Sequence, residues 1–470
     1  MSQSTPISSQ QLPSPKGKFL VGHLTQFSRE DKHLVLEDWV KEVGDVFRIS
    51  LMGKKFIVSA NTSVNKEILR QRPKVFSRYF KMSEIMEEIG ILGVFNAEGD
   101  VWKNHRIIIS EALNRRNVER FFPTVTKVAE RLLNKWSSMA NNGEEIDVQK
   151  EMMRYTVDIT SEIAFGYPMN TLEKGEDVIQ NHMEKIFPMI NARITAPLPT
   201  WRWFKSKKDK EFDHSINEVK TFVHNLIEKG KKGLADNPEI KDKPNNFLEA
   251  LLAQQAIEGK FTNDEVFGNV FTMLLAGEDT TSNSLSWALF YLAQHPKMVE
   301  KIRKEAQQVY GSKSIPPTYK QASQLKYTDA VVQEVLRIKP VTPQLYLTAL
   351  ENVEIEGYLF KKGESLMTQN KVAQTDANSF IRPDEFMPER WISNGCPVHG
   401  GEHKPEIVRT FGGGSRLCPG KGLATSEMVI TLSSICKNFN IELVGSPEDV
   451  KEVFMFTMYP KGLRVHLKML

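Results

Sequence analysis

The feature that most restricts the fold is a long apolar segment between Thr262 and His295. Thr262 and Glu265 form a capping box, which predicts that a helix begins there, and His295-Pro296 predicts its end. Such a helix would span about 33 residues, or about 50 Å. Its segment 271–276 is apolar on nearly every side, and a helix of that kind is buried. We therefore expect a large, mainly helical protein built around this helix.

The rest of the chain predicts a mostly α fold with minor β. Segments 46–49 and 55–58 flank Met52-Gly53 and predict a β-hairpin. From Ser63 to Phe290 the apolar positions recur every three or four residues, as they do in helices. Strand patterns return near 353–358 and over about the last 30 residues.

The sequence shows no internal repeat and no low-complexity linker. We therefore expect a single domain over residues 1–470. Within it, residues 1–18 are expected to form a flexible, proline-rich leading segment, and the β structure near the N-terminus a small subregion of its own.

Charge and cysteine content exclude several classes of protein. The 62 Lys and Arg residues against 58 Asp and Glu residues leave a net charge of +4, which argues against a nucleic-acid-binding protein. Cys396, Cys418 and Cys436 form neither a disulfide framework nor a zinc-ligand pattern, and they fit a reducing compartment. The polar N-terminus lacks a signal-peptide core, and no stretch reaches the roughly 18–20 apolar residues of a membrane span. We expect a cytoplasmic monomer with no transmembrane anchor.

The strongest chemical signal is the decapeptide FGGGSRLCPG at 411–420. Its glycines permit close approach to a flat ligand, and a helix pattern follows from Leu423. Backbone N–H groups near that helix start can stabilise a thiolate at Cys418 and tune a metal that it binds. A thiolate ligand pushes electron density toward O–O cleavage in haem oxygenases, and Arg416 can pair with a haem propionate. The alternative is a glycine turn beside a structural cysteine.

A second signal lies inside the long helix, in the hexapeptide AGEDTT at 276–281. Polar residues in a buried helix are costly unless they have partners. Gly277 and Thr280 are one turn apart, a spacing that can loosen the local hydrogen-bond ladder and open a groove. An acid beside an alcohol can relay protons to dioxygen. The alternative is that the hydroxyls only bond to backbone carbonyls of their own helix.

Two weaker signals consist of residue pairs on one helix face. Glu334 and Arg337 have the spacing of an ion pair, although such pairs usually lie on the surface and contribute little. Trp102 and Arg106 can both donate to a carboxylate. Alternatively, they form a cation–π pair with each other.

Taken together, the four motifs resemble those of the cytochrome P450 family, in the family's order and over nearly the whole chain. The decapeptide matches every fixed position of the family pattern Phe-x-x-Gly-x-Arg-x-Cys-x-Gly. The resemblance implies the P450 fold, with the long central helix over haem b, and it indicates a soluble bacterial-type member. It makes Cys418 the iron ligand, with Phe411, Gly414 and Gly420 in the loop around it.

The same resemblance assigns roles to the other motifs. Thr280 would be the dioxygen-side hydroxyl and Asp279 the acid behind it, supported by Glu278 and Thr281, with Ala276 and Gly277 beside the haem. Trp102, Arg106 and Arg416 would bind the haem propionates. Glu334, Arg337 and Arg390 would form a buried structural triad. One departure is that many members place an arginine near the position of Leu347, so a third propionate partner is in doubt.

The resemblance also suggests a substrate pocket between the long helix and the haem. Its candidate residues are Phe95, Thr342, Gln344, Leu345, Phe456 and Thr457. Phe95 could equally be a plain core aromatic. Because apolar candidates dominate, we expect a lipophilic substrate such as a fatty acid, a terpenoid or a steroid-like molecule.

The implied activity is that of a haem-thiolate monooxygenase that hydroxylates or epoxidises its substrate. We expect no bound flavin or iron–sulfur cluster in this chain, and therefore a separate ferredoxin or flavodoxin with its reductase. An acidic partner of this kind would dock near Lys103, Arg115 and Arg116. The alternatives are a peroxide-driven or isomerising haem-thiolate enzyme and a non-catalytic haem-binding sensor.

Overall fold

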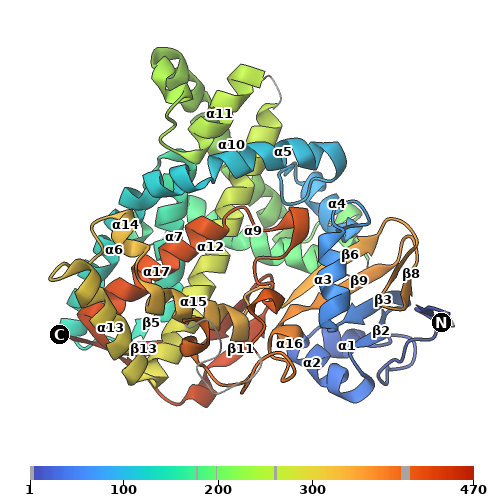
Figure 1. The fold of residues 1–470 in the computed structure, drawn as a ribbon. Helices are drawn as coiled ribbons and strands as arrows, with labels where there is room; N and C mark the ends of the chain where they lie inside the picture. The colour runs from blue at the N-terminus through green and yellow to red at the C-terminus, as the bar shows by residue number, and fades with distance from the viewer. Residues whose placement is uncertain (1–4, 176–177, 197, 259–261, 393–402) are drawn as a thin grey trace.

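The computed structural model describes residues 5–175, 178–196, 198–258, 262–392 and 403–470. Within these residues the chain is mostly helical with a minor β component, which confirms the predicted fold class. Helices make up one side of the molecule, and a β-rich region lies at the other side, near the N-terminus (Figure 1). Of the three cysteines, Cys396 lies outside the described residues.

The long helix is α12, Asn263–Gln294, and it forms as predicted. The Thr262 hydroxyl accepts a hydrogen bond from the backbone N–H of Glu265, and the Glu265 carboxylate accepts one from the backbone N–H of Thr262 at 2.7 Å. At its other end, His295 is the C-cap and Pro296 begins the next helix. Since most of its residues from Val266 to Leu292 are buried, α12 runs through the interior.

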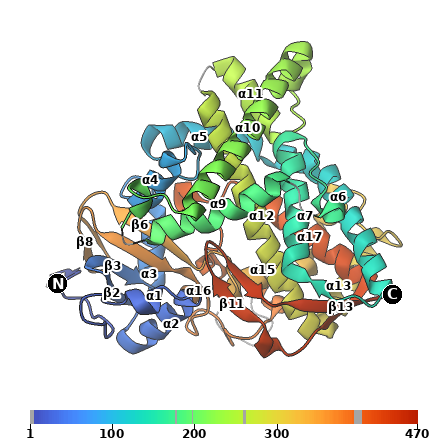
Figure 2. The same cartoon turned by 180° about the vertical axis from the view of Figure 1, so that it is seen from behind.

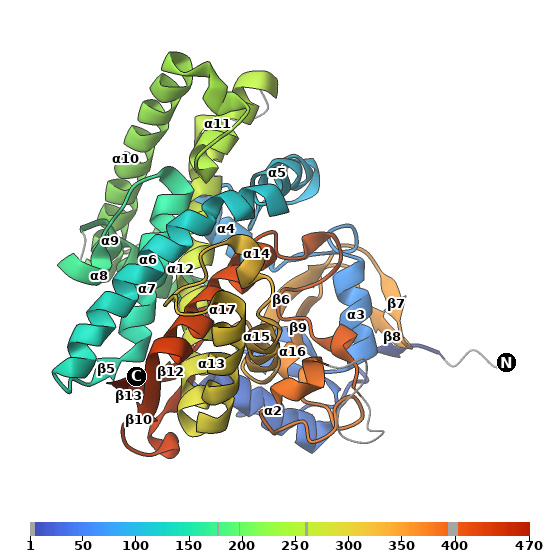
Figure 3. The same ribbon diagram turned by 60° about the vertical axis from the view of Figure 1, so that its left-hand side comes forward.

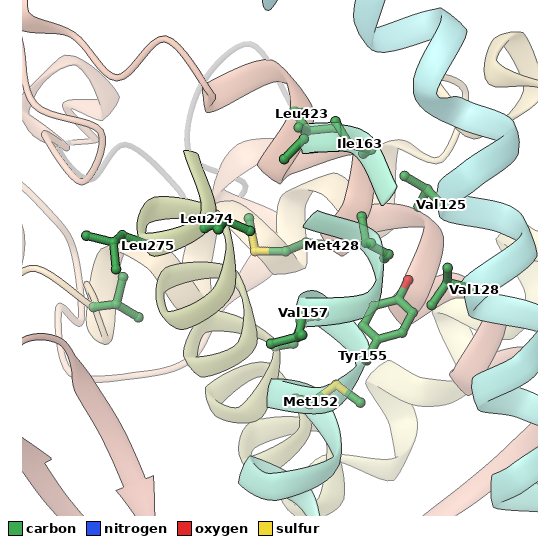
Figure 4. Packing of buried hydrophobic residues seen from close by; sticks show 14 of the residues in the cluster. Val125, Val128, Met152, Tyr155, Val157, Ile163, Leu274, Leu275, Leu423 and Met428 are labelled. Carbon is green, nitrogen blue, oxygen red and sulfur yellow. The ribbon is translucent and has the colours of Figure 1, made fainter. Parts of the chain in front are cut away.

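Three further helices enclose α12. Helix α7 (Val148–Phe165) lies along it, and α6 (Arg115–Asn141) packs on the far side of α7. Helix α17 (Lys421–Asn438) contacts both α6 and α12 (Figure 3). Figure 4 shows buried apolar side chains from α6, α7, α12 and α17, and the cluster to which they belong provides most of the core.

The N-terminal β region is built on a five-stranded sheet in the order β2-β3-β9-β6-β4. The predicted hairpin is present as β2 (Val46–Leu51) and β3 (Lys54–Ser59), and Met52 and Gly53 at its turn have φ values of 48° and 82°. The other strands are β9 (Ser365–Gln369), β6 (Gln344–Ala349) and β4 (Phe76–Arg78).

The segment near 353–358 departs from the simple strand that its pattern predicts. It contains β7 (Val353–Ile355) and the start of β8 (Tyr358–Phe360), which pair as an antiparallel hairpin. Glu356 and Gly357, both with positive φ, make the turn between them. Within the expected leading segment, β1 (Ile7–Ser8) pairs with β8, and Leu12 is buried.

The predicted C-terminal strands form two small sheets, seen from behind in Figure 2. Strand β13 (Arg464–Met469) pairs with β10 (Phe439–Leu443) and β5 (Ile146–Asp147). Strands β11 (Lys451–Phe454) and β12 (Met458–Lys461) form a hairpin whose turn carries Phe456 and Thr457.

The remaining helices cover this frame, and α10 and α11 extend away from it together (Figures 1 and 3). Their bounds are α1 Leu24–Phe27, α2 Lys32–Val43, α3 Thr62–Arg70, α4 Phe80–Glu88, α5 Gly99–Ala112, α8 Thr171–Lys174, α9 Val178–Thr195, α10 Lys207–Asp236, α11 Phe247–Glu258, α13 Pro296–Tyr310, α14 Tyr319–Ala322, α15 Lys326–Ile338 and α16 Asn370–Gln374.

Candidate active site

A cavity of about 1000 Å³ lies where α12, the glycine-rich loop before α17 and the β region meet. Cys418 and Thr280, from the two strongest motifs, both line it. The predicted site residues that share this lining are Trp102, Arg106, Ala276, Gly277, Phe411, Arg416 and Gly420, together with all six pocket candidates, Phe95, Thr342, Gln344, Leu345, Phe456 and Thr457. The tertiary fold therefore brings together segments that are more than 300 residues apart in the sequence.

Of the predicted catalytic and cofactor-binding residues, Asp279 and Gly414 lie outside the lining that the described residues form, as does the supporting candidate Glu278, whereas Thr281 belongs to it. Gly414 has a φ of +60° and faces α3 instead. A Cβ atom there would lie 2.4 Å from the carbonyl oxygen of Leu69, a distance that no side chain tolerates. Gly414 therefore permits the loop to pack closely against α3.

The loop presents the Cys418 thiol to the cavity. Its backbone N–H donates to the carbonyl of Phe411 at 2.9 Å, which closes the loop, and α17 begins three residues later. Burial raises the pKa of the Cys418 thiol, while hydrogen bonds from the backbone N–H groups of Gly420 and Lys421 and the charge of Arg106 act to lower it. The local helix start thus supplies the N–H donors that its sequence pattern predicts.

On α12, Thr280 faces the cavity and its hydroxyl donates to the carbonyl of Ala276 at 2.6 Å. Gly277 is packed closely against α7, because a Cβ atom there would lie 2.7 Å from Oγ1 of Thr160. The glycine therefore permits close contact between two helices, in addition to the groove that its spacing to Thr280 predicts.

Asp279 points toward the β11–β12 turn. Its carboxylate accepts hydrogen bonds from the hydroxyl of Thr457 and from Nδ2 of Asn283, the latter at 3.2 Å. Asn283 Nδ2 also donates to Thr457 Oγ1 at 2.9 Å. Burial raises the pKa of Asp279, and these two donors oppose the rise. A second cavity of about 180 Å³ contacts both Asp279 and Thr457, so Thr457 stands between two cavities.

The aromatic and basic candidates meet at the other end of the main cavity. The Arg416 guanidinium lies 4.4 Å from the ring centroid of Trp102, so the cation–π partner of Trp102 is Arg416 and not Arg106, with which the sequence pairs it. Arg416 also donates to the carboxylate of Glu98 and, at 2.7 Å, to the carbonyl of Ala97. Its Nε is buried and has no hydrogen-bond partner within the described residues.

Phe95 and Phe456 line the cavity side by side, with ring centroids 6.5 Å apart. Gln344 is buried, and its Nε2 donates to the hydroxyl of Tyr346, which also lines the cavity. Gln344 and Thr457 both bind protein partners through their polar groups. The aromatic rings are therefore the surfaces that these pocket candidates leave for contact with a ligand.

The glutamate–arginine triad is fully buried behind the cysteine loop. Arg337 donates to both carboxylate oxygens of Glu334 at 2.9 Å, and Arg390 Nε donates to the same carboxylate at 2.9 Å. Arg337 also donates to the carbonyl of Gln374 at 3.1 Å. The Gln374 side chain in turn accepts from the backbone N–H of Arg409 at 2.7 Å, at the start of the cysteine loop. The triad therefore connects to the loop through Gln374.

Several arginines that no motif predicts also line the cavity, among them Arg72, between α3 and β4, and Arg78, at the end of β4. The segment 70–78 carries four basic residues and no acidic residue. In a sequence, such a segment is typical of a solvated surface. Only the packing of α3 and β4 against the cavity distinguishes these two residues from Arg70, which is exposed.

Among the described residues, no helix is both long enough and apolar enough to cross a membrane.

Comparison with known proteins places these features in a family. The family model described as cytochrome P450 matches residues 12–467. Protein LUTEIN DEFICIENT 5, chloroplastic, of Arabidopsis thaliana is 26% identical over 467 residues, covering 96% of this chain and 76% of the relative. Carotene epsilon-monooxygenase, chloroplastic, of the same plant is 25% identical over 432 residues, covering 87% of this chain and 77% of the relative.

A third relative is bacterial. The bifunctional cytochrome P450/NADPH–P450 reductase 2 of Bacillus subtilis is 27% identical over 469 residues, covering 97% of this chain and 42% of the relative. Since the relatives include plant chloroplast proteins as well as this bacterial one, they do not support the expectation of a bacterial-type member.

Proposed function

Because this chain belongs to the cytochrome P450 family of haem-thiolate monooxygenases, we propose that it hydroxylates or epoxidises a lipophilic small molecule with one oxygen atom of O₂. The single observation that carries the proposal is that Cys418 and Thr280 line the same cavity of about 1000 Å³. A cavity of that size can hold both a cofactor and a drug-sized molecule. The cavity therefore has room for both the haem and the substrate that the two motifs predict.

The residues around the cavity fit haem b. Cys418 offers one thiol with N–H donors from Gly420 and Lys421 beside it, and Trp102 offers an aromatic surface. Arg416 retains a buried Nε that finds no hydrogen-bond partner in the described part of the chain, and an anionic group would satisfy it. When bound, cysteine-ligated haem supplies the activation of O₂. We propose that Cys418 holds the iron and that Trp102, Arg106 and Arg416 hold the propionate end.

The polar residues of α12 would transfer protons into the cavity. Thr280 provides a hydroxyl at the cavity wall. Asp279 reaches the same cavity indirectly, because its carboxylate holds the hydroxyl of Thr457, which lines the cavity. A proton held by Asp279 can therefore pass to Thr457 Oγ1 and onward into the cavity, while the smaller cavity gives Asp279 access to another source of protons. Thr280 and Asp279 would both act as proton-transfer groups in this scheme.

The substrate would be a fatty acid, a terpenoid or a steroid-like molecule. Phe95, Leu345 and Phe456 contribute apolar side chains to the lining, and Gln344 and Thr457 have their polar groups engaged elsewhere. Burial of an apolar ligand against such walls is favourable. One relative is named for its action on carotene, which is a terpenoid.

Electrons would come from a separate ferredoxin or flavodoxin and its reductase. The family match takes up residues 12–467. Lys103, Arg115 and Arg116 are exposed on α5 and at the start of α6, and α5 also carries Trp102 and Arg106 at the cavity. We propose that an acidic partner docks there. The rate of reduction should then fall as salt is added, and a rate independent of salt would count against this surface.

The decisive test is the carbon monoxide difference spectrum of the reduced protein, with Cys418→Ser as the variant and Cys436→Ser as its matched control. Cys436 is also a free thiol, but it is buried in the protein core on α17. We expect the red-shifted band of a thiolate ligand in the wild type and in Cys436→Ser, and its loss in Cys418→Ser. A band at the position of a histidine ligand in the wild type would exclude Cys418 as the iron ligand.

One observation favours a second candidate, a peroxide-driven haem-thiolate enzyme. Asp279 is outside the main cavity, so its acid group is not directly available to dioxygen. The variant Thr280→Ala separates the two candidates. A monooxygenase should lose product formed per NAD(P)H consumed, whereas an enzyme that uses peroxide should retain its peroxide-driven turnover.

We further propose that the protein acts as a monomeric single domain in the cytoplasm. Cys418 and Cys436 are free thiols in the described part of the chain, and a reducing compartment keeps thiols in that form. Cell fractionation and the sedimentation of the purified protein would check both statements.

A further inference from the structure

The chain lacks an arginine at Leu347, yet it places one beside that position. Strands β4 and β6 are antiparallel, and Arg78 is the residue directly paired with Leu347. The Arg78 side chain lines the cavity, and its guanidinium lies over the ring of Phe95 at 3.7 Å from the centroid. Its Nε donates to the carbonyl of Phe95. A cation is therefore present at this edge of the cavity, supplied by the neighbouring strand.

Arg72 lines the same cavity and is 5% exposed. Its Nε and Nη2 are buried, and neither has a hydrogen-bond partner within the described part of the chain. These two nitrogens form the edge of the guanidinium with which Arg337 binds both oxygens of Glu334 in this protein. Leaving such an edge unpaired costs free energy, so its burial points to a carboxylate ligand that completes it.

The charges near Arg72 are also unbalanced. Arg72, Arg78 and Arg416 repel one another, and Glu98 is the carboxylate that attracts all three. Three cations against one carboxylate leave two positive charges without compensation. Burial, together with this repulsion, lowers the pKa of Arg72 to about 10. Arg106 adds a further cation, which faces Cys418.

We propose that Arg72 and Arg78, together with Arg416, bind the two haem propionates and replace the arginine that is missing at Leu347. This inference rests on the proposed function, since it requires haem. The two propionates, bound also by Trp102 and Arg106, would supply negative charge that the arginine cluster lacks. The open edge of Arg72 can take one carboxylate through two parallel hydrogen bonds. Arg78, fixed by Phe95, contributes its remaining N–H groups.

The test compares haem with haem dimethyl ester, whose propionates are neutral, in the wild type, Arg72→Met and Arg78→Met. The rate of transfer to apomyoglobin measures retention of each cofactor. We expect each variant to lose haem about 10- to 100-fold faster, because hydrogen bonds to a charged group are removed. Retention of the ester should be nearly unchanged. Arg70→Gln is the control, because Arg70 is exposed and pairs with Glu67, and it should behave as wild type.

A second readout needs no cofactor. Because Nε and Nη2 of Arg72 are buried without a hydrogen-bond partner among the described residues, Arg72→Met should raise the unfolding temperature of the apoprotein while it weakens haem retention. Equal losses of haem and ester would mean that the arginines act by packing alone, and unchanged loss rates would mean that they do not contact the propionates. Either result would overturn the inference and leave the proposed function intact. A wild type that takes up no haem would instead remove the proposed function.

Discussion

The hydroxyl of Thr457 donates a hydrogen bond to the carboxylate of Asp279, which lies 178 residues earlier in the chain. Asn283 braces the pair, since its Nδ2 contacts both residues. This contact turns the acid of α12 away from the main cavity and connects it to a residue that lines it. In the proposed relay, the acid expected from this short motif would therefore act through a third residue on a different element.

Thr457→Val should disconnect Asp279 from the cavity. We expect product per NAD(P)H to fall by up to about 100-fold, the scale of a positioned proton donor. Burial already raises the pKa of Asp279 and Thr457 opposes that rise, so loss of the hydroxyl should raise the pKa further. Because the relay needs Asp279 in its protonated form, the alkaline limb of the pH profile should move to higher pH. Thr126→Val, on the outer part of α6, is the control, and a pH profile unchanged in Thr457→Val would contradict the relay.

Gly277→Ala should destabilise the protein, although alanine is the better helix former. The new Cβ would lie 2.7 Å from Oγ1 and 2.8 Å from Cγ2 of Thr160, so α12 and α7 would have to separate. We expect the free energy of unfolding to fall by about 1–3 kcal/mol. Adding Thr160→Ala removes both atoms and should restore stability, with a gain in helix propensity of about 1 kcal/mol. If the double variant were as unstable as the single one, contact with Thr160 would not be the cause.

Arg337→Met should destabilise the fold strongly. It leaves the Glu334 carboxylate buried with part of its hydrogen bonding lost, and breaking a buried pair in this way costs about 3–5 kcal/mol. The cysteine loop should also become disordered, because Arg337 is connected to it through Gln374. Urea denaturation measures the first effect and haem content the second. The exposed pair of Arg382 and Glu385 is the control, and Arg382→Gln should cost less than about 1 kcal/mol.

Glu427, on α17, should make the protein less stable as pH rises. Burial raises its pKa to about 8 from an ordinary value of 4.5, and its Oε1 is buried without a partner within the described residues. The folded state therefore binds a proton more tightly than the unfolded state, so stability falls as pH rises between these two values.

Glu427→Gln should remove this dependence. We expect it to stabilise the protein by more than about 1 kcal/mol at pH values above about 8, with little effect below about 4.5. Urea midpoints at the two ends of this window provide the measurement. Glu442→Gln, at an exposed pair with Lys468, should show no such pH-dependent gain. An equal effect of Glu427→Gln at both ends would mean that the side chain stays ionised in the fold.

The sequence by itself determined the features that depend on residues close together in the chain. The capping box of Thr262 and Glu265 predicts the start of α12, because the partners are three residues apart. The turn at Met52-Gly53 predicts the hairpin for the same reason. The decapeptide around Cys418 predicts a loop followed by a helix, and the structure has both. Hydrogen bonds between residues this close in the sequence can be inferred from the local pattern of residue types.

Only the tertiary structure decided what each side chain contacts. It placed Thr160 against Gly277, Thr457 against Asp279, and Arg78 opposite Leu347. Residues 70–78 have the composition of a solvated segment, yet Arg72 is buried at the cavity. Such contacts join residues more than 100 positions apart, and they form because burying the apolar faces of α12, α7 and the sheet fixes where those segments meet. The local pattern carries no information about that meeting point.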